Sequence, residues 1–185
     1  MTTFDDLWFR AGEASQHAEQ AYHRLREQYE GFLEVEYHRQ VSRPRFRTLI
    51  ERIEGSGAPY GAHTIVYQPS GELLLVRHDG VDLWVLPGGE VAPDEEFQRT
   101  AVRELAEEAG VDAEYDGLGI LTQVRITCGE YETQGVIPIF AARALTTETQ
   151  IADPDDEISA ARWFSELPDD TRDREDLLAW RERAL

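Results

Sequence analysis

The sequence contains no lysine and only one cysteine. Cys128 has no second cysteine to pair with, so a scaffold held by intramolecular disulfides is excluded. No apolar run approaches the ~20 residues that a membrane-spanning helix requires, and no basic and apolar signal segment opens the sequence. A chain of 185 residues is long enough to bury a core. We therefore expect a soluble, cytoplasmic protein that does not act at a membrane.

The charge is strongly unbalanced. All 18 basic residues are arginines, and they face 37 acidic residues, which gives a formal net charge of -19. Self-repulsion on this scale opposes the compact state at low salt, but it is screened when the Debye length shrinks to ~3 Å at 1 M salt. An acidic surface made for a basic partner would predict an acidic block or tail, whereas these acids are spread over the whole chain. We therefore interpret the composition as adaptation to salt, with a halophilic archaeon as the expected host.

Residues 1–57 are predicted to form a helical extension. From Trp8 to Phe32 the less polar residues recur at steps of three and four, which is the spacing of one side of a helix. A second, shorter helix is predicted from Pro44 to Ile53, before the glycine-rich stretch "EGSGAPYG". We expect the first helix to pack against the rest of the same chain. The alternative is a homodimer contact through the N-terminal helices.

Residues 58–185 show a different pattern, in which short apolar runs rich in β-branched residues predict strands. A helix is predicted over residues 94–110, with Asp94 capping its start and Gly110 taking the left-handed position at its end. Strands and helices intermix without strict alternation, so a mixed sheet sandwiched by helices is expected rather than a doubly wound parallel one. The predicted strands cover residues 62–67, 72–78, 83–90, 117–127, 135–145 and 158–164, and a last helix covers 172–183.

The predicted helix carries three clustered carboxylates. Glu104, Glu107 and Glu108 stand at i, i+3 and i+4, so they project from one side of the helix, roughly opposite Ala101 and Leu105. Carboxylates held this close repel one another unless a cation neutralises them, and hard oxygen ligands suit Mg²⁺ or Mn²⁺. Taken alone, the cluster is more typical of a solvated face on a very acidic protein than of a metal site.

The spacing around the cluster resembles the Nudix family. Counting from Gly89 through Glu95 to the stretch "RELAEEAGV", which ends at Val111, every defined position of the Nudix box is filled. The preceding stretch "LLLVRHDGVDLWVLPGGE" and the later "EISAARWFSELPDD" also resemble the segments that flank the box in that family. The resemblance covers about residues 58–185 and does not cover the N-terminal extension.

The resemblance implies a fold, a metal site and an enzymatic activity. The fold would be an α/β/α sandwich with a mixed sheet, in which the box forms a loop, a helix and a second loop. Glu104, Glu107 and Glu108 would bind the divalent cation, Mg²⁺ or Mn²⁺, together with the carbonyl oxygen of Gly89. The reaction would be hydrolysis of a nucleoside diphosphate linked to another moiety, with water attacking phosphorus.

Other residues of the box would have different roles. By the same resemblance, Glu95 and Arg103 would be structural and would brace the loop against the helix. The general base is a box glutamate in some members of the family and a loop carboxylate in others. We therefore expect Glu104 or Glu107 to act as the base, with Glu157 in "DPDDEI" as the candidate outside the box.

The natural substrate is not specified by the sequence, beyond a small molecule of the nucleotide type. Arg77, Trp84 and Tyr131 are candidates for clamping a phosphate or stacking on a base, although Trp84 also fits the core or rim of the sheet. Surface ion pairs with neighbouring glutamates are expected for the arginines of "RQVSRPRFRTLIER", and contact with polyphosphate or RNA is the alternative, so nucleic acid is not an expected partner. These arginines are Arg39, Arg43, Arg45, Arg47 and Arg52.

A second functional hypothesis is a Nudix scaffold with weak catalysis, which would bind nucleotides or regulate a partner through its N-terminal helices. The complete box argues against this hypothesis, because a binding module has no need of the whole carboxylate set. No metal is assigned to His63 or His78, since both lie near predicted strand ends where ordinary hydrogen bonding is the default.

The interpretation of the acidic composition predicts a dependence on salt. The free energy of unfolding should fall as KCl is lowered from molar to tens of millimolar, because repulsion among the carboxylates is then less screened. Urea unfolding at a series of KCl concentrations measures the effect. A stability that does not change with KCl would contradict the interpretation.

Overall fold

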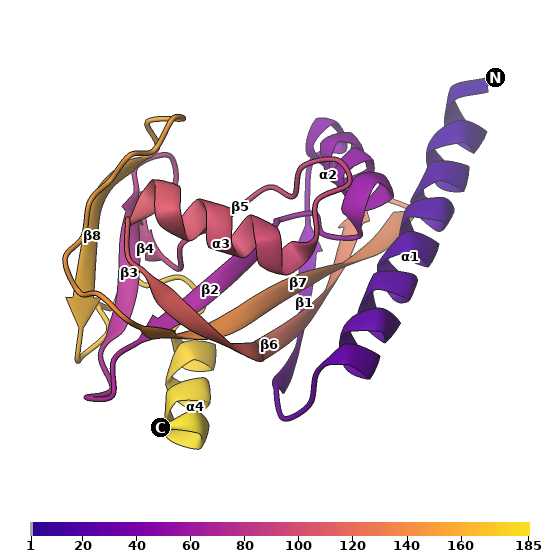
Figure 1. The fold of residues 1–185 in the computed structure, drawn as a ribbon. Helices are drawn as coiled ribbons and strands as arrows, with labels where there is room; N and C mark the ends of the chain where they lie inside the picture. The colour runs from indigo at the N-terminus through magenta and orange to yellow at the C-terminus, as the bar shows by residue number, and fades with distance from the viewer. Residues whose placement is uncertain (1) are drawn as a thin grey trace.

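The structure, a computed structural model, describes residues 2–185, with side chains from residue 6 onward (Figure 1). Four helices and eight strands alternate irregularly along this part of the chain. Their order is α1 (Thr2–Gln28), β1 (Leu33–Gln40), α2 (Arg43–Ser56), β2 (Ala62–Tyr67), β3 (Leu73–His78), β4 (Leu83–Val85), β5 (Gly88–Gly89), α3 (Phe97–Glu108), β6 (Ala113–Cys128), β7 (Tyr131–Ala144), β8 (Ile158–Phe164) and α4 (Arg174–Ala184).

The strands form one mixed sheet, as predicted. Its order is β1-β6-β7-β2-β3-β4, with β5 paired to β2 and β8 paired to β3. Two pairs are parallel, β1 with β6 and β2 with β7. The long strands β6 and β7 form an antiparallel hairpin from Ala113↔Ala144 to Cys128↔Tyr131. This hairpin therefore separates β1 from the rest of the sheet.

Helices cover both faces of the sheet, which confirms the predicted α/β/α sandwich. On one face, Leu25 of α1 and Ala101 of α3 share an apolar cluster with Phe140 of β7. On the other face, Leu177 and Trp180 of α4 pack with apolar residues of β2, β3, β6 and β7. Figure 1 shows α3 and α4 on opposite sides of the strands.

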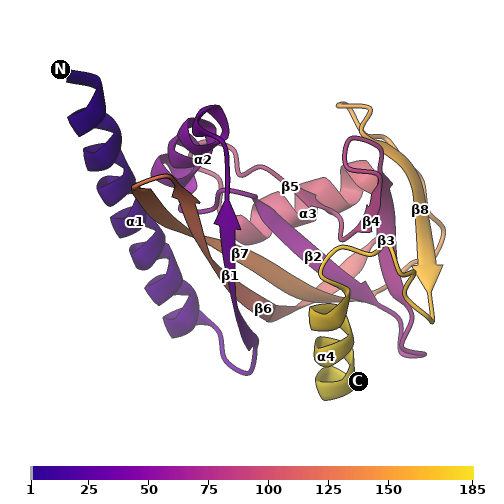
Figure 2. The ribbon, with the colours of Figure 1, turned by 180° about the vertical axis from the view of Figure 1, so that it is seen from behind.

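The N-terminal extension is not wholly helical, so this part of the sequence prediction was wrong. Residues 33–40 form β1, which pairs with β6 in register from Leu33↔Ile120 to Gln40↔Thr127 and lies at the edge of the sheet (Figure 2). The stretch "LEVEYHRQ" has apolar residues at every second position, Leu33, Val35 and Tyr37, which is the period of a strand. The second predicted helix is confirmed as α2, whose N-terminus is capped by Ser42.

Helix α1 packs against its own chain, as expected. It ends at Gln28 rather than at Phe32, and its buried side is formed by Leu7, Ala11, Ala14, Ala18, Ala21 and Leu25. Trp8 is 69% exposed, so the predicted seam was out of phase at its start. The apolar side of α1 is therefore covered by α2 and the sheet. None of the helices in the described residues is long and apolar enough to cross a membrane.

The acidic helix begins later than predicted. α3 starts at Phe97, and Asp94 lies in the preceding turn with φ of 62°, a left-handed conformation that Asp tolerates better than most residues. Its predicted capping role was therefore wrong; the N-cap residue is Glu96, whose side chain makes no capping hydrogen bond. At the other end Gly110 has φ of 65°, as predicted.

The shared core predicts that the N-terminal segment unfolds together with the sheet. Phe46 of α2 is fully buried in a cluster with Val124 and Ile126 of β6, so Phe46→Ala should lower the free energy of unfolding by about 3–5 kcal/mol. Phe9→Ala is the matched control, because Phe9 is 59% exposed and its loss should cost less than about 1 kcal/mol. Urea unfolding at one KCl concentration compares the two; equal losses would mean that α2 lies outside the cooperative core.

Candidate active site

The short strand β5 brings the glycine pair of the box against the acidic helix. Gly89 pairs with Ala62 of β2, and the neighbouring Gly88 pairs with His63. A Cβ atom on Gly89 would lie 2.5 Å from the carboxyl group of Glu104, closer than any real contact. Glycine at position 89 is therefore what lets the helix carboxylate approach the loop backbone.

Glu108 is the most deeply buried carboxylate of the cluster. Glu108 is only 7% exposed, and its Oε2 accepts a hydrogen bond of 2.9 Å from the backbone N–H of Gly88. Burial raises the pKa of Glu108 to about 8, and the nearby charges of Glu104, Asp153 and Glu157 act in the same direction. A carboxylate in this position is without a counter-charge, so it favours either a proton or a cation.

Glu104 lies between the glycine pair and Arg103. Its Oε1 accepts a hydrogen bond of 2.7 Å from Nη1 of Arg103. Burial nevertheless raises the pKa of Glu104, and repulsion from Glu107 and Asp155 adds to that effect. Glu107 is less buried, with Oε2 at 3.5 Å from the same guanidinium nitrogen.

Arg103 and Glu95 join the loop before α3 to the helix. Nε and Nη2 of Arg103 donate hydrogen bonds of 3.1 and 3.0 Å to the two carboxylate oxygens of Glu95. Glu95 also accepts hydrogen bonds from the backbone N–H of Ala92 and the hydroxyl of Thr100. This set of donors, led by Arg103, lowers the pKa of Glu95 to about 2. Arg103 in turn donates to the carbonyl oxygen of Glu90 at 3.3 Å, which holds the loop just after the glycine pair.

A second group of carboxylates comes from the loop between β7 and β8. The backbone N–H groups of Gln150 and Ala152 donate hydrogen bonds of 2.7 and 2.8 Å to the carbonyl oxygens of Ala109 and Glu107, which docks this loop on the end of α3. Asp153, Asp155 and Glu157 thereby line the same cavity as the box carboxylates Glu104 and Glu108. The sequence predicted Glu157 and missed the other two, although the acidic run "DPDDE" was visible.

Asp153 has a structural function within that loop. Its carboxylate accepts hydrogen bonds from the backbone N–H groups of Asp155, Glu157 and Ile158, at 3.1, 2.7 and 3.0 Å. These bonds fix the turn that carries Glu157. Nε2 of His78, the last residue of β3, lies 3.4 Å from Oε2 of Glu157, so the Glu157 side chain is also in contact with the end of that strand.

These carboxylates line a large cavity of about 920 Å³. Glu104 and Glu108 line it together with the glycine pair, whereas Glu107 does not. Its floor is apolar and comes from central strands, through Ile120 and Ile139. A cavity of this volume is in the range of small-molecule sites. Three arginines of the N-terminal segment also line the cavity, namely Arg39, Arg45 and Arg52.

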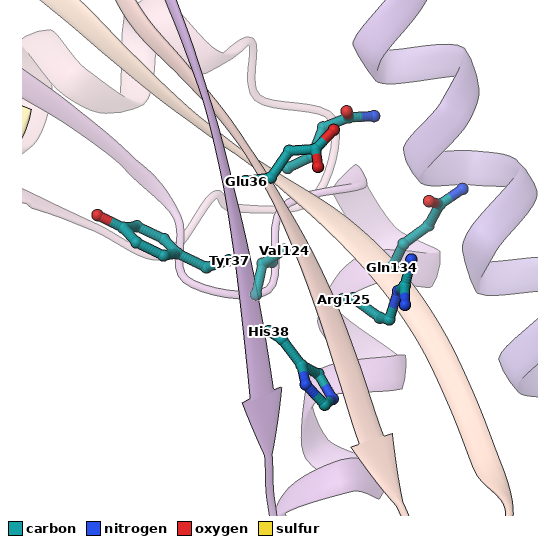
Figure 3. Close-up of a pocket in the computed structure, with 7 residues that line it drawn as sticks. Glu36, Tyr37, His38, Val124, Arg125 and Gln134 are labelled. Atoms are coloured by element: carbon teal, nitrogen blue, oxygen red, sulfur yellow. The ribbon is translucent and has the colours of Figure 1, made fainter.

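A smaller hollow of about 310 Å³ lies over β1, β6 and β7 (Figure 3). It is lined by polar side chains such as Glu36, His38 and Arg125, and the side chain of Tyr37 points away from them. Side chains of successive residues in β1 therefore point to opposite faces of the sheet. None of the predicted catalytic residues lines this hollow, so it is separate from the carboxylate cavity.

The three side chains predicted to bind substrate do not line the large cavity. Arg77 is engaged by Asp82 and by Asp170, whose Oδ2 lies 2.5 Å from Nη1. Trp84 packs edge-on against Phe164 with ring centroids 4.8 Å apart. Tyr131 is buried beside Phe46 in the cluster of α1 and α2. The structure thus gives each of these three side chains packing or pairing contacts outside the large cavity.

Two histidines, His63 and His78, line the cavity. Nε2 of His63 lies 3.0 Å from the carbonyl oxygen of Tyr60, and burial lowers the pKa of the ring. A neutral imidazole that donates to this carbonyl is the ordinary hydrogen bonding expected at a strand end. His63 also packs against Gly88, where a Cβ atom would lie 2.2 Å from its Nδ1.

The donor set suits a hard divalent cation. Among the described residues, no three His, Cys, Asp or Glu side chains already stand together in a metal-binding arrangement. The carboxylate of Glu104 is drawn to Arg103 and that of Glu108 to the backbone of Gly88. All of these donors are oxygens, and the buried Glu108 has no cationic partner, so the residues fit Mg²⁺ or Mn²⁺ with small side-chain shifts.

Comparison with known proteins identifies the family. The NUDIX domain family matches residues 58–180, which contain the glycine pair, the acidic helix and the docked loop. The chain belongs to the Nudix family. The N-terminal elements α1, β1 and α2 lie outside this Nudix region.

Individual relatives share limited parts of the sequence. A Bacillus subtilis (strain 168) protein named "Putative 8-oxo-dGTP diphosphatase" is 49% identical over 53 residues, which are 29% of this chain and 36% of that protein. The chain therefore matches little more than a third of the length of this curated relative. A MutT NUDIX hydrolase from Burkholderia pseudomallei is 24% identical with a TM-score of 0.49, over 68% of this chain and 96% of that one. An ADP-ribose pyrophosphatase from Streptococcus suis is 24% identical with a TM-score of 0.48, over 65% and 87%.

The ion pair of the Nudix box predicts a pH-dependent contribution to stability. Because the pKa of Glu95 falls from its ordinary 4.5 to about 2 on folding, its contribution is complete above about pH 4.5 and is lost as pH falls toward 2. Glu95→Gln should therefore lower the free energy of unfolding by about 2–3 kcal/mol at neutral pH and by much less near pH 3.

Glu96→Gln is the matched control, since the neighbouring side chain is exposed and makes no capping bond. It should change the free energy of unfolding by less than about 0.5 kcal/mol at either pH. Urea unfolding at pH 7 and pH 3 measures both variants. A loss for Glu95→Gln that is the same at the two pH values would rule out the ionised pair as its origin.

Proposed function

We propose that the protein is a divalent-metal-dependent hydrolase that cleaves the pyrophosphate bond of a nucleoside diphosphate linked to another moiety. The observation that carries the proposal is the burial of Glu108 against Gly88, without a counter-charge, at the wall of the large cavity. A buried carboxylate is costly unless a partner compensates its charge. The membership of the Nudix family supports the same reading of the site.

Glu104 and Glu108 would hold the cation, with the carbonyl oxygen of Gly89 beside them. Glu107 would contribute from the margin, because it does not line the cavity and lies within ion-pair distance of Arg103. A divalent cation bound here supplies charge for the phosphate oxygens and lowers the pKa of a bound water. Arg103 and Glu95 would hold the helix and the loop in position for this task.

The proton of the attacking water would pass to a carboxylate at the cavity. Water oxygen forms the new bond to phosphorus, the bridging P–O bond breaks, and the leaving phosphate departs with the electron pair. Glu104 and Glu157 both line the cavity and are therefore our candidates for the base. Asp153 would act by positioning, since its hydrogen bonds fix the turn that carries Glu157.

The metal assignment is tested by removing one negative charge at a time. Glu104→Gln and Glu108→Gln should each lower Mg²⁺-dependent kcat by about 100-fold or more, because the loss of a ligand costs several kcal/mol of transition-state stabilisation. Neither variant should unfold, since glutamine has no charge to bury. Glu130→Gln, in the exposed turn after β6, removes the same charge elsewhere and should retain full activity.

The measurement is phosphate or pyrophosphate release at molar KCl, with Mg²⁺ or Mn²⁺. The substrate panel should contain ADP-ribose, deoxynucleoside triphosphates including 8-oxo-dGTP, and dinucleoside polyphosphates. Urea unfolding of each variant shows whether it is folded. Full turnover in Glu108→Gln would contradict the metal site, and no hydrolysis by the unaltered protein across the panel would favour a binding or regulatory role.

A further inference from the structure

Arginines from outside the Nudix region line the same large cavity as the carboxylates. Arg39 comes from β1, and Arg45 and Arg52 come from α2; all three line the cavity. The family match begins at residue 58, so these side chains are not part of the Nudix domain. The N-terminal segment therefore adds three cationic side chains to a cavity that the Nudix region otherwise forms.

Strand β1 aims Arg39 at the cavity by its alternation. Tyr37 points away from Glu36 and His38 (Figure 3), and the hydroxyl of Tyr37 donates to the carboxylate of Asp176 in α4. Asp176 lines the large cavity, so the odd-numbered side of β1 faces it. Arg39 is two residues after Tyr37 and lies on the same side.

The arginine row starts next to the box loop. Nη2 of Arg52 pairs with Oε2 of Glu90 at 2.8 Å, and Glu90 is the residue whose carbonyl oxygen accepts from Arg103. Arg52 is therefore connected to the loop that precedes the acidic helix. Arg52 already has a carboxylate partner, which distinguishes it from the other two arginines of the wall.

Arg39 and Arg45 have aromatic neighbours in place of carboxylates. The guanidinium carbon of Arg39 lies 5.6 Å from the ring centroid of Tyr37, and that of Arg45 lies 5.9 Å from the ring centroid of Tyr60. No ion pair joins either arginine to an acid among the side chains described from residue 6 onward. In a chain with 37 acidic and 18 basic residues, arginines in a cavity that pair with none of those acids remain available to an anionic ligand.

The chemistry of the ligand follows from the two groups of side chains that share the cavity. The box carboxylates would take the pyrophosphate group through a divalent cation, as proposed above. The guanidinium groups of Arg39 and Arg45 present forked N–H donors, which suit a phosphate group without any metal. A substrate that uses both groups at once would therefore carry phosphate beyond the pyrophosphate that is cleaved.

We propose that Arg39 and Arg45 bind an additional phosphate of the substrate and select substrates that carry three or more consecutive phosphates. This inference rests on the proposed function for the cleavage site, but the arginine wall itself is independent of the metal. Both arginines would bind the substrate directly, at a phosphate that is not part of the bond cleaved.

The binding test uses inorganic tripolyphosphate as the probe, by titration calorimetry without added divalent metal and at one low KCl concentration at which the chain is folded. The unaltered protein should bind tripolyphosphate at the arginines, because the carboxylates repel it in the absence of metal. The double variant Arg39→Gln/Arg45→Gln should weaken this binding by about 10-fold or more. No binding by the unaltered protein, or a loss of less than about 2-fold in the double variant, would overturn the proposal.

Arg47→Gln/Arg99→Gln is the matched control. It also removes two arginine charges, from exposed positions on α2 and α3 that do not line the cavity. It should change tripolyphosphate binding by less than about 2-fold. If this control weakens tripolyphosphate binding as much as the cavity variant does, the effect is one of total charge and the proposal fails.

Kinetics provide the second readout. With a deoxynucleoside triphosphate, Arg39→Gln/Arg45→Gln should raise KM by about 10-fold with kcat changed by less than about 2-fold, because the lost contact is made equally in ground and transition states. With ADP-ribose both constants should stay within about 2-fold. The same rise in KM for both substrates, or for neither, would contradict selection by phosphate number.

The two proposals fail in different ways. Full turnover in Glu108→Gln would contradict the metal site and leave the metal-free binding difference as the test of the arginines. Normal metal-dependent turnover, with tripolyphosphate binding that does not respond to Arg39→Gln/Arg45→Gln, would contradict the arginine wall alone.

Discussion

The two-pronged contact between Arg103 and Glu95 holds the candidate active site together. It joins a helix to the loop before it, in a chain where negative charges far outnumber positive ones. The same guanidinium contacts Glu104 and lies within ion-pair distance of Glu107, so one cation organises three carboxylates. Without that cation the acidic side of α3 would repel the loop that it has to approach. The pair also leaves Glu108 outside its reach, and burial raises the pKa of this residue to about 8, so its charged form needs a cation.

The N-terminal segment belongs to the same body as the Nudix region. Helix α2 fills a cluster with β6, and β1 extends the sheet beyond the family domain by parallel pairing. Tyr37 of β1 contacts Asp176 of α4, so the first strand and the last helix meet at the rim of the cavity. The cavity is therefore built from both ends of the chain, and its shape depends on a segment that the Nudix family does not supply.

Local patterns predicted the parts of the site that local geometry determines. The spacing of Glu104 and Glu108 places them one turn apart on a helix, and the structure brings both to the cavity. The mixed sheet and most strands also followed from apolar runs and turn residues. Strand β1 was missed because residues 33–40 lie between the two predicted helices, and the alternation of Leu33, Val35 and Tyr37 was not used.

The other differences between the predicted site and the structure depend on contacts between distant segments. Asp153 and Asp155 reach the site because backbone groups of their loop bind the end of α3, and no spacing in the sequence encodes that docking. Arg39 and Arg45 were expected to pair with neighbouring glutamates, whereas they face a cavity that exists only once β1 joins the sheet. Arg77 and Trp84 were plausible by residue type, but their contacts are with side chains on β4, β8 and adjoining loops.

The docking of the β7–β8 loop has a consequence for motion. Its two hydrogen bonds use the carbonyl oxygens of Glu107 and Ala109, which a helix end otherwise leaves to water. If the loop lifts, the last turn of α3 loses its partners at the same moment as Asp155 and Glu157 leave the cavity. The order of this loop and the order of the acidic helix are therefore coupled, so that exchange of the Gln150 and Ala152 amide hydrogens reports whether the carboxylate set is assembled.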